Sequence, residues 1–191
     1  PPTDSSPMYA RDTLAKLIRN HALQFGDFTL ASGKQASYYL DCRKVTLDSR
    51  GAKLIGEGMI DLIGEMRLKM GQGPKLVGGM AVGADPITAA VLTTAGIKGY
   101  SLRGVIVRKE PKEHGKGKQV EGPYESGESI VIVEDVVTTG GSSLRAIEAC
   151  EAEGLKVERV LAIVDRLEGG REAYKEAGYE LTTLLDRKRG A

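Results

Sequence analysis

The sequence predicts an α/β fold: a central, mostly parallel sheet flanked by helices. Short apolar runs rich in Val, Ile and Leu recur after Lys75, and stretches with helical patterning separate them. Such runs are typical of strands buried on both faces, as in a parallel sheet. Strands that alternate with helices imply right-handed βαβ crossovers. The chain has 191 residues, enough for one such domain and hardly enough for two, so residues 1–191 are expected to form a single domain.

The first fifty residues do not follow this alternation. Residues 11–26 have the pattern of a helix, and residues 28–43 are β-like. Residues 1–50 are therefore expected to form a small N-terminal hood or lid. The next segment, residues 52–66, predicts an amphipathic helix, because six apolar side chains share one helical face. They are Leu54, Ile55, Met59, Leu62, Ile63 and Met66.

The rest of the chain supplies the sheet and its covering helices. Strands are predicted over residues 75–79, 104–109, 129–135, 159–166 and 179–186. Helices are predicted over residues 85–96, 142–154 and 169–180. The first has Asp85 as its N-cap, Pro86 at its first position and Gly96 just past its end. The second is capped by Ser142 or Ser143 and stopped by Gly154.

Composition limits the classes of partner. The formal net charge is +1, so no large field would attract nucleic acid or a membrane surface. No apolar run approaches the ~20 residues that span a bilayer. The start, PPTDSSPMYA, lacks the basic and apolar regions of a signal peptide. Cys42 and Cys150 lie far apart, so no structural disulfide is expected. The prediction is a cytoplasmic protein with neither nucleic acid nor membrane as a partner.

One strand ends in paired acids, followed by small hydroxyl-bearing residues. Glu134 and Asp135 follow the apolar run at residues 130–133, and the next residues are rich in Thr, Gly and Ser. Ligands of open parallel sheets bind beyond the carboxyl ends of the strands. A helix N-terminus there offers free N–H groups to a phosphate, while the acids can accept hydrogen bonds from two ribose hydroxyls. The expected phosphate-binding residues are Thr138, Thr139, Gly140, Gly141 and Ser142, with Ser143 as a further hydroxyl donor.

The segment VIVEDVVTTGGSS, residues 131–143, resembles the phosphoribosyl pyrophosphate (PRPP) motif of the type I phosphoribosyltransferase family. An ordinary strand–loop–helix turn with an acidic end is the plainer interpretation, although generic phosphate loops do not require the double acid. A Walker A loop is excluded, because no G-x-x-x-x-G-K-[ST] occurs. Glu134 stands where many members have aspartate, and its longer side chain is still expected to reach a ribose hydroxyl.

The polar segment 109–129 has no period, and a loop of this length is typically functional or disordered. Its start, VRKEPKEHGKG, resembles the flexible catalytic loop of the orotate phosphoribosyltransferases. The resemblance implies that Arg108, Lys109, Lys112 and His114 contact the PRPP pyrophosphate and act in catalysis together with Asp135, Lys109 being the most important. A solvated run of charges is the alternative interpretation.

Other segments carry the same resemblance, which spans about residues 25–170. Residues 25–41 are similar to the family's N-terminal region over the orotate ring, and residues 77–88 to its pyrophosphate loop. VDRLEGG, residues 164–170, resembles the segment whose arginine binds the orotate carboxylate, a role suited to a guanidinium fork. The implied orotate-binding residues are Arg166, Thr138, Tyr38, Tyr39 and Ser32.

The chain also departs from the family pattern at two places. Ala31 and the Val82–Gly83 pair stand where some members have lysines, so cations are missing from the phosphate-binding region. The sequence leaves open whether Lys34, Arg43 or Lys44 supplies the missing positive charge.

The resemblance implies transfer of 5-phosphoribosyl from PRPP to N1 of orotate. The products are orotidine 5′-phosphate and pyrophosphate, in the de novo pathway to UMP. Mg²⁺ is the implied cofactor, held mainly by the pyrophosphate and ribose hydroxyls, with Glu134 and Asp135 as outer-shell contacts. A homodimer is also implied, in which the catalytic loop reaches the neighbouring subunit's site. A phosphoribosyltransferase for another base and a PRPP-sensing nucleic-acid-binding regulator are the rivals; the balanced charge argues against the second.

Overall fold

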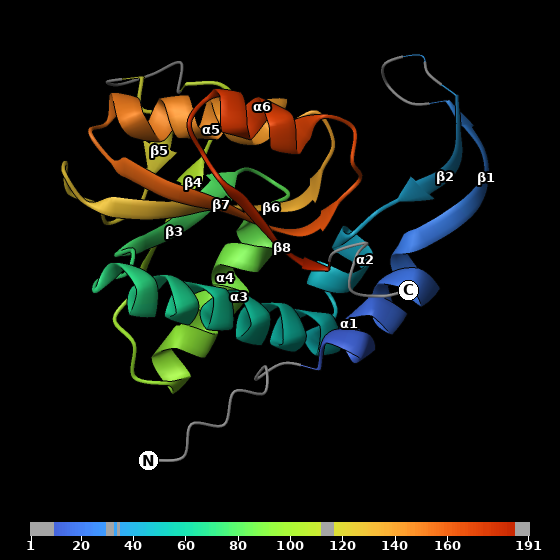
Figure 1. The fold of residues 1–191 in the computed structure, drawn as a ribbon, viewed down its shortest axis with the longest axis horizontal. Coiled ribbons are helices and arrows are strands. Elements are labelled where there is room, and N and C mark those ends of the chain that lie inside the picture. Colours follow the sequence, from blue (N-terminus) through green and yellow to red (C-terminus); the bar gives the residue numbers. More distant parts are fainter. Residues whose placement is uncertain (1–9, 30–32, 34, 112–116, 186–191) are drawn as a thin grey trace.

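Six strands form the central sheet of the computed structural model, which describes residues 10–29, 33, 35–111 and 117–185 (Figure 1). The strand order is β5-β4-β3-β6-β7-β8, and only β5 runs antiparallel to its neighbour. The expected mostly parallel sheet is confirmed. The strands are β3 (Leu76–Met80), β4 (Arg103–Val107), β5 (Val120–Glu121), β6 (Ser129–Val137), β7 (Lys156–Asp165) and β8 (Leu181–Leu185).

Helices cover both faces of this sheet. In Figure 1, α3 (Ser49–Met70) and α4 (Asp85–Ile97) lie below it, and α5 (Gly141–Ala152) and α6 (Gly170–Glu176) lie above it. Side chains of β6 alternate between the two layers, since successive strand residues point to opposite faces. Val131 and Val133 join the core with α3 and α4, whereas Ile130 and Ile132 join the core with α5. This double burial explains the continuous apolar run.

The N-terminal region divides into two parts. Helix α1 (Arg11–Leu17) packs on α3 and β8, and Leu14 is fully buried there. A π-helical turn (Ile18–Ala22) follows, then β1 (Leu23–Thr29) and β2 (Gln35–Leu40), which form a separate antiparallel sheet. This hairpin projects from the body of the molecule in Figure 1. The helix expected over residues 11–26 is wrong beyond Ala22, because the chain there already pairs with β2.

Three predicted ends of α4 and α5 are also wrong. The cap residue of α4 is Ala84, and the helix runs through Gly96 to Ile97, since Gly99 (φ +74°) reverses the chain instead. At α5 the cap position belongs to Gly140 (φ +85°), so Ser142 and Ser143 lie inside the first turn. Glycines with positive φ therefore decide the C-terminal end of α4 and the start of α5.

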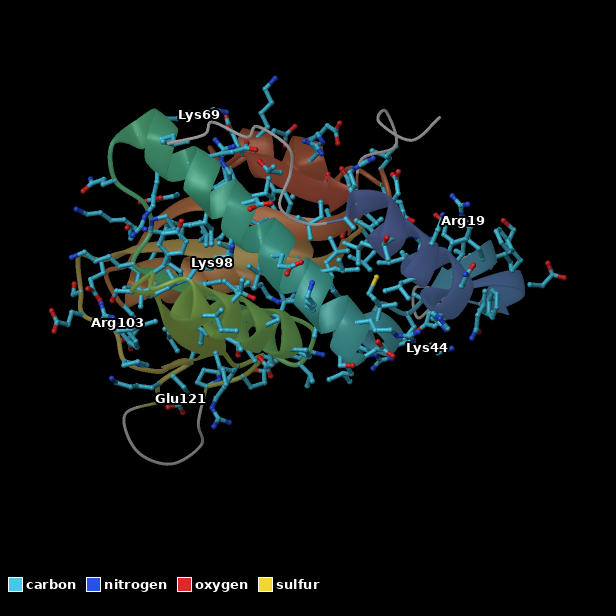
Figure 2. All side chains as sticks on the ribbon, turned by 90° about the horizontal axis from the view of Figure 1, so that it is seen from below. Arg19, Lys44, Lys69, Lys98, Arg103 and Glu121 are labelled. Carbon is cyan, nitrogen blue, oxygen red and sulfur yellow. The ribbon has the colours of Figure 1, made fainter. Side chains whose placement is uncertain are left out.

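The polar segment 109–129 contains more structure than expected. Its residues Val120–Glu121 form β5, which pairs with β4, and residues 112–116 lie outside the described part of the chain. Figure 2 views the molecule from the side of α3 and α4. The labelled Lys44 and Arg19 lie at one end, near the hairpin, and Arg103 and Lys69 lie toward the other. Among the described helices, none has the length and apolarity that crossing a membrane requires.

Candidate active site

The two acids of β6 differ in their surroundings. The strand continues to Val137, two residues beyond the predicted end, so both carboxylates belong to the pleated part of the sheet. Glu134 is only 8% exposed, and its Oε2 accepts a hydrogen bond from Ser143 Oγ at 2.8 Å. Burial, followed by the charge of Asp135, raises the pKa of Glu134 to about 8. Glu134 and Asp135 also interact through their side chains, so the two acids expected at the ribose remain next to each other.

Asp135 is half-buried and faces the loop that follows β3. Its Oδ1 accepts a hydrogen bond from the backbone N–H of Val136 at 2.8 Å. A Cβ placed on Gly83 would lie 3.3 Å from the same Oδ1, so this glycine gives the loop its close approach to the acid. The loop includes a cis peptide between Ala81 and Val82. Asp135 and the expected pyrophosphate loop therefore share one corner of the site.

The expected phosphate loop lies between β6 and α5. Gly140 takes a left-handed φ and packs against Tyr174, whose ring carbon would be 3.1 Å from an added Cβ. Gly141 differs, because a Cβ there would have no atom within 4 Å. Thr138 and Ser142 are half-buried beside this open space, and Thr139 is exposed. The free N–H groups of the α5 N-terminus suit an anion at this position.

A tight turn joins the phosphate loop to the end of β7. Arg166 N donates to Val137 O at 2.9 Å, and Gly170 N donates to Thr138 O at 2.9 Å. Leu167 has φ +61°, and its N–H donates to Asp165 Oδ1 at 2.8 Å. The turn thus holds Arg166 next to the phosphate loop.

Arg166 contacts the hairpin as well as its own turn. Its side chain is 10% exposed, and Nε lies 2.9 Å from Glu168 Oε1. The guanidinium carbon lies 4.6 Å from the centroid of the Tyr38 ring, a cation–π contact. Tyr39 points to the other face of the hairpin, where its ring centroid is 5.8 Å from that of Phe28. Two of the residues expected at orotate are therefore in contact, and Tyr39 is not one of them.

Two of the predicted loop cations, Arg108 and Lys109, lie away from Asp135. Arg108 and Lys109 are exposed at the end of β4, which β3 separates from β6. Arg108 Nε pairs with Glu121 Oε1 at 3.1 Å. Three predicted residues, Lys112, His114 and Ser32, lie outside the described residues.

Several residues of the site make contacts that the sequence did not predict. Ser143, expected as a phosphate donor, instead binds Glu134. Glu168 was not singled out, although its place two residues after Arg166 is a signal for a local ion pair. Of the possible compensating cations, Lys34 is outside the described residues, and Lys44 is exposed on α2 (Arg43–Thr46). Arg43 is held by Asp41 near Asp135.

Comparisons with known proteins agree with this geometry. Residues 52–182 match the family model described as "Phosphoribosyl transferase domain". The orotate phosphoribosyltransferase of Rhodopirellula baltica is 57% identical over 90% of this chain and 89% of its own length. The Mycobacterium tuberculosis orotate phosphoribosyltransferase superposes with a TM-score of 0.80 at 35% identity, covering 93% of this chain and 97% of that one.

A second structure of the Mycobacterium tuberculosis enzyme contains 5-phospho-α-D-ribosyl 1-diphosphate, and it superposes with a TM-score of 0.76 at 32% identity. It covers 92% of this chain and 94% of that one. The identity and coverage are sufficient to assign the family, and they bear out the sequence resemblance. The chain belongs to the orotate phosphoribosyltransferases, within the larger phosphoribosyltransferase family.

Proposed function

We propose that this chain transfers the 5-phosphoribosyl group of PRPP to N1 of orotate, giving orotidine 5′-phosphate and pyrophosphate. The observation that carries the proposal is the Arg166–Tyr38 pair, placed beside the loop at the α5 N-terminus. An arginine stacked on an aromatic ring can bind a carboxylate, and a flat pyrimidine can stack in the same region. Any flat base could use the stacking, so the pairing of the arginine with a carboxylate is the feature that favours orotate over adenine or uracil.

The donor is proposed to lie across the carboxyl end of β6. Its 5-phosphate accepts hydrogen bonds from the Thr138–Ser142 loop, in the open space over Gly141. Asp135, on the loop side of β6, accepts hydrogen bonds from the ribose hydroxyls. Glu134, buried beside Asp135 and held by Ser143, supports this arrangement. Its direct contact with ribose, expected from the sequence, is part of the same proposal.

In the reaction, the bond between ribose C1 and the pyrophosphate oxygen breaks, and its electron pair leaves with pyrophosphate. N1 of orotate forms the new bond to C1 through an oxocarbenium-like transition state, and the proton of N1 is released to pyrophosphate or to solvent. Lys109 is proposed to stabilise the departing charge, together with Arg108, Lys112 and His114. The proposed catalytic loop, residues 109–129, would exclude water from the site and so prevent hydrolysis of the ribosyl group.

Mg²⁺ fits this site as an ion carried by the substrate. Within the described residues, no group of three His, Cys, Asp or Glu side chains could hold a metal. Glu134 is buried against Ser143, so Asp135 is the carboxylate in position to contact the ion's water. When bound, the ion would neutralise charge on the pyrophosphate.

A homodimer in the cytoplasm is the proposed form of the enzyme. The cations at the end of β4 lie two strands from Asp135 in the same chain, which supports their use in a neighbouring subunit's site. A mixture of a Lys109→Ala chain and an Asp135→Asn chain tests this. Recovered activity is expected, because one site then regains both residues. Absence of recovery after proven subunit exchange would contradict shared sites.

The substrate is tested with a panel of bases and PRPP, with nucleotide formation followed by chromatography. Orotate is expected to react, whereas uracil, adenine and xanthine, which lack the carboxylate, are expected to react far more slowly. Preference for any of these three would replace the proposal with another member of the phosphoribosyltransferase family.

A further inference from the structure

In the part of the chain that the structure describes, two Asp-x-Arg clamps have the same geometry. In one, Arg43 donates from Nε and Nη2 to the two oxygens of Asp41, at 2.8 and 3.1 Å. In the other, Arg50 donates from the same atoms to Asp48, at 3.0 and 3.0 Å. The arginine side chains are 56% and 63% exposed. The clamps therefore differ in their surroundings and not in their internal structure.

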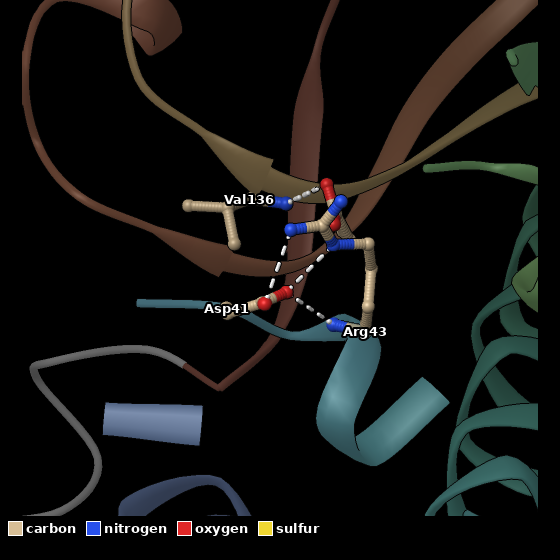
Figure 3. Close-up of polar contacts among 4 residues, drawn as sticks. Asp41, Arg43 and Val136 are labelled. Atoms are coloured by element: carbon tan, nitrogen blue, oxygen red, sulfur yellow. Dashed lines mark hydrogen bonds and ion pairs between the residues drawn. The ribbon is translucent and has the colours of Figure 1, made fainter. Parts of the chain in front are cut away.

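Only the first clamp lies at the candidate active site. Figure 3 shows Asp41 and Arg43 at the carboxyl end of β6, next to the backbone N–H of Val136 that binds Asp135. The hydrogen bonds that Arg43 donates to Asp41 are the main cause of its raised pKa, and the charge of Asp41 and smaller contributions from Tyr39 and Asp135 add to it. The pKa of Arg50 is raised by Asp48 alone.

The Asp41 clamp leaves one edge of the Arg43 guanidinium for another ligand. A guanidinium has five N–H donors in a planar fork, and Asp41 uses the Nε and Nη2 side. Among the residues that the structure describes, none accepts a hydrogen bond from Nη1. The free edge is held in a fixed orientation, and its geometry matches the oxygens of a phosphate.

The position of Arg43 indicates which phosphate it would meet. The 5-phosphate site at the α5 N-terminus packs against Tyr174 and Gly170, on the face of β6 that Glu134 shares. Arg43 and Gly83 flank Asp135 instead, at the side of the site that carries the loop after β3. If Asp135 binds the ribose hydroxyls, this side receives the end of PRPP that bears the pyrophosphate.

We propose that Arg43 binds the pyrophosphate of PRPP and that Asp41 is the positioning residue that orients it. The inference rests on the proposed function, because Asp135 marks the ribose position. It assigns a cation to the region where this chain has Ala31, Val82 and Gly83. Arg43 is a substrate contact in the resting geometry, and it does not depend on closure of the 109–129 segment.

The test compares Arg43→Gln with Arg50→Gln, which breaks the matched clamp outside the site. Loss of a charge-assisted contact is expected to raise the KM for PRPP about tenfold or more in Arg43→Gln. The KM for orotate is expected to stay within about twofold, since Arg43 would not touch the base. Arg50→Gln is expected to keep both wild-type values, and Arg43→Lys to fall between the wild type and Arg43→Gln for PRPP.

Inhibition by two fragments of the donor locates the contact. Arg43→Gln is expected to weaken inhibition by pyrophosphate and to leave inhibition by ribose 5-phosphate unchanged. Unchanged pyrophosphate inhibition, a raised KM for orotate alone, or equal losses in Arg43→Gln and Arg50→Gln would each overturn the proposal. An inactive wild-type enzyme would instead contradict the proposed function, and direct titration with pyrophosphate would still compare the two variants.

Discussion

The Arg166 guanidinium carbon lies 4.6 Å from the centroid of the Tyr38 ring, so the turn after β7 and the N-terminal hairpin meet in one contact. The arginine is nearly buried, and Glu168 balances its charge at 2.9 Å. An ion pair with one acidic neighbour and a stacked aromatic face together restrict the guanidinium to one orientation. The hairpin is thereby coupled to the part of the sheet proposed to bind the base.

Replacing Arg166 tests its proposed role at the orotate carboxylate. Arg166→Gln is expected to raise the KM for orotate by about tenfold to a hundredfold, the size of a lost charge-assisted hydrogen bond. The KM for PRPP should change little. Arg145→Gln, an exposed arginine on α5, is the control. Steady-state kinetics with each substrate varied in turn separates the two constants, and a rise confined to PRPP would contradict the assignment.

Ser143 and Ser142 are neighbours with different expected roles. Ser143→Ala removes the donor to buried Glu134 and is expected to lower the free energy of unfolding by about 1–3 kcal/mol. Ser142→Ala removes a proposed phosphate donor and should raise the KM for PRPP without that loss of stability. Denaturant unfolding and kinetics of both variants provide the measurement. Equal stability of the two would show that the Ser143–Glu134 contact is unimportant.

Glu134 should make stability depend on pH. Because burial and Asp135 raise its pKa from 4.5 to about 8, the folded protein holds a proton that the unfolded chain releases. The resulting stabilisation is complete below pH 4.5 and is lost as pH rises through about 8. Relative to Glu134→Gln, the wild type should therefore lose free energy of unfolding between pH 5 and pH 9. Glu148→Gln, at an exposed position on α5, controls for general charge effects. If the difference in free energy of unfolding between the wild type and Glu134→Gln does not change with pH, Glu134 is not protonated in the folded state.

Substitutions at Gly170 and Gly141 test core packing and phosphate binding separately. An added Cβ at Gly170 would lie 2.4 Å from Val137 Cγ1 and 2.7 Å from Thr138 O, so Gly170→Ala is expected to be destabilising, by about 1–3 kcal/mol. Gly141→Ala meets no protein atom and should keep its stability, but its methyl group would enter the proposed phosphate space. Its expected defect is a raised KM for PRPP. Thermal unfolding and kinetics distinguish these outcomes. Wild-type kinetics in Gly141→Ala would show that the phosphate does not bind over Gly141.

Lys109 is expected to act on turnover. Lys109→Ala should lower kcat by about 10²–10³, as loss of a transition-state charge contact does, with PRPP still bound. Lys118→Ala is the matched control, since Lys118 lies on the far side of the same segment near Tyr124. A near-normal kcat in Lys109→Ala would show that this loop does not take part in the mechanism.

The sequence predicted those parts of the structure that depend on local pattern. The double burial of β6 and the presence of a helix after its glycine-rich loop follow from residues that are adjacent in the chain, so both elements could be predicted, although not their exact ends. The sheet and its parallel direction followed from the alternation of elements. The family could be identified because both the acidic end of the strand at Glu134 and Asp135 and the basic segment that begins with Arg108 and Lys109 are short motifs of adjacent residues.

Contacts between distant segments could not be predicted in the same way. The approach of Arg43 to Asp135 depends on how α2 packs beside β6, and no local pattern specifies that packing. The burial of Glu134 against Ser143 likewise depends on how α5 packs on β6. The helix ends were missed for a local reason, since glycines with positive φ outcompeted the more usual side-chain caps.

The reaction itself is tested most directly by the ultraviolet absorbance of orotate on addition of the protein, PRPP and Mg²⁺. The account predicts a decrease that requires all three and that reverses when orotidine 5′-phosphate and pyrophosphate are supplied instead. An unchanged spectrum, with a folded protein that binds PRPP, would contradict the assignment of orotate as the substrate.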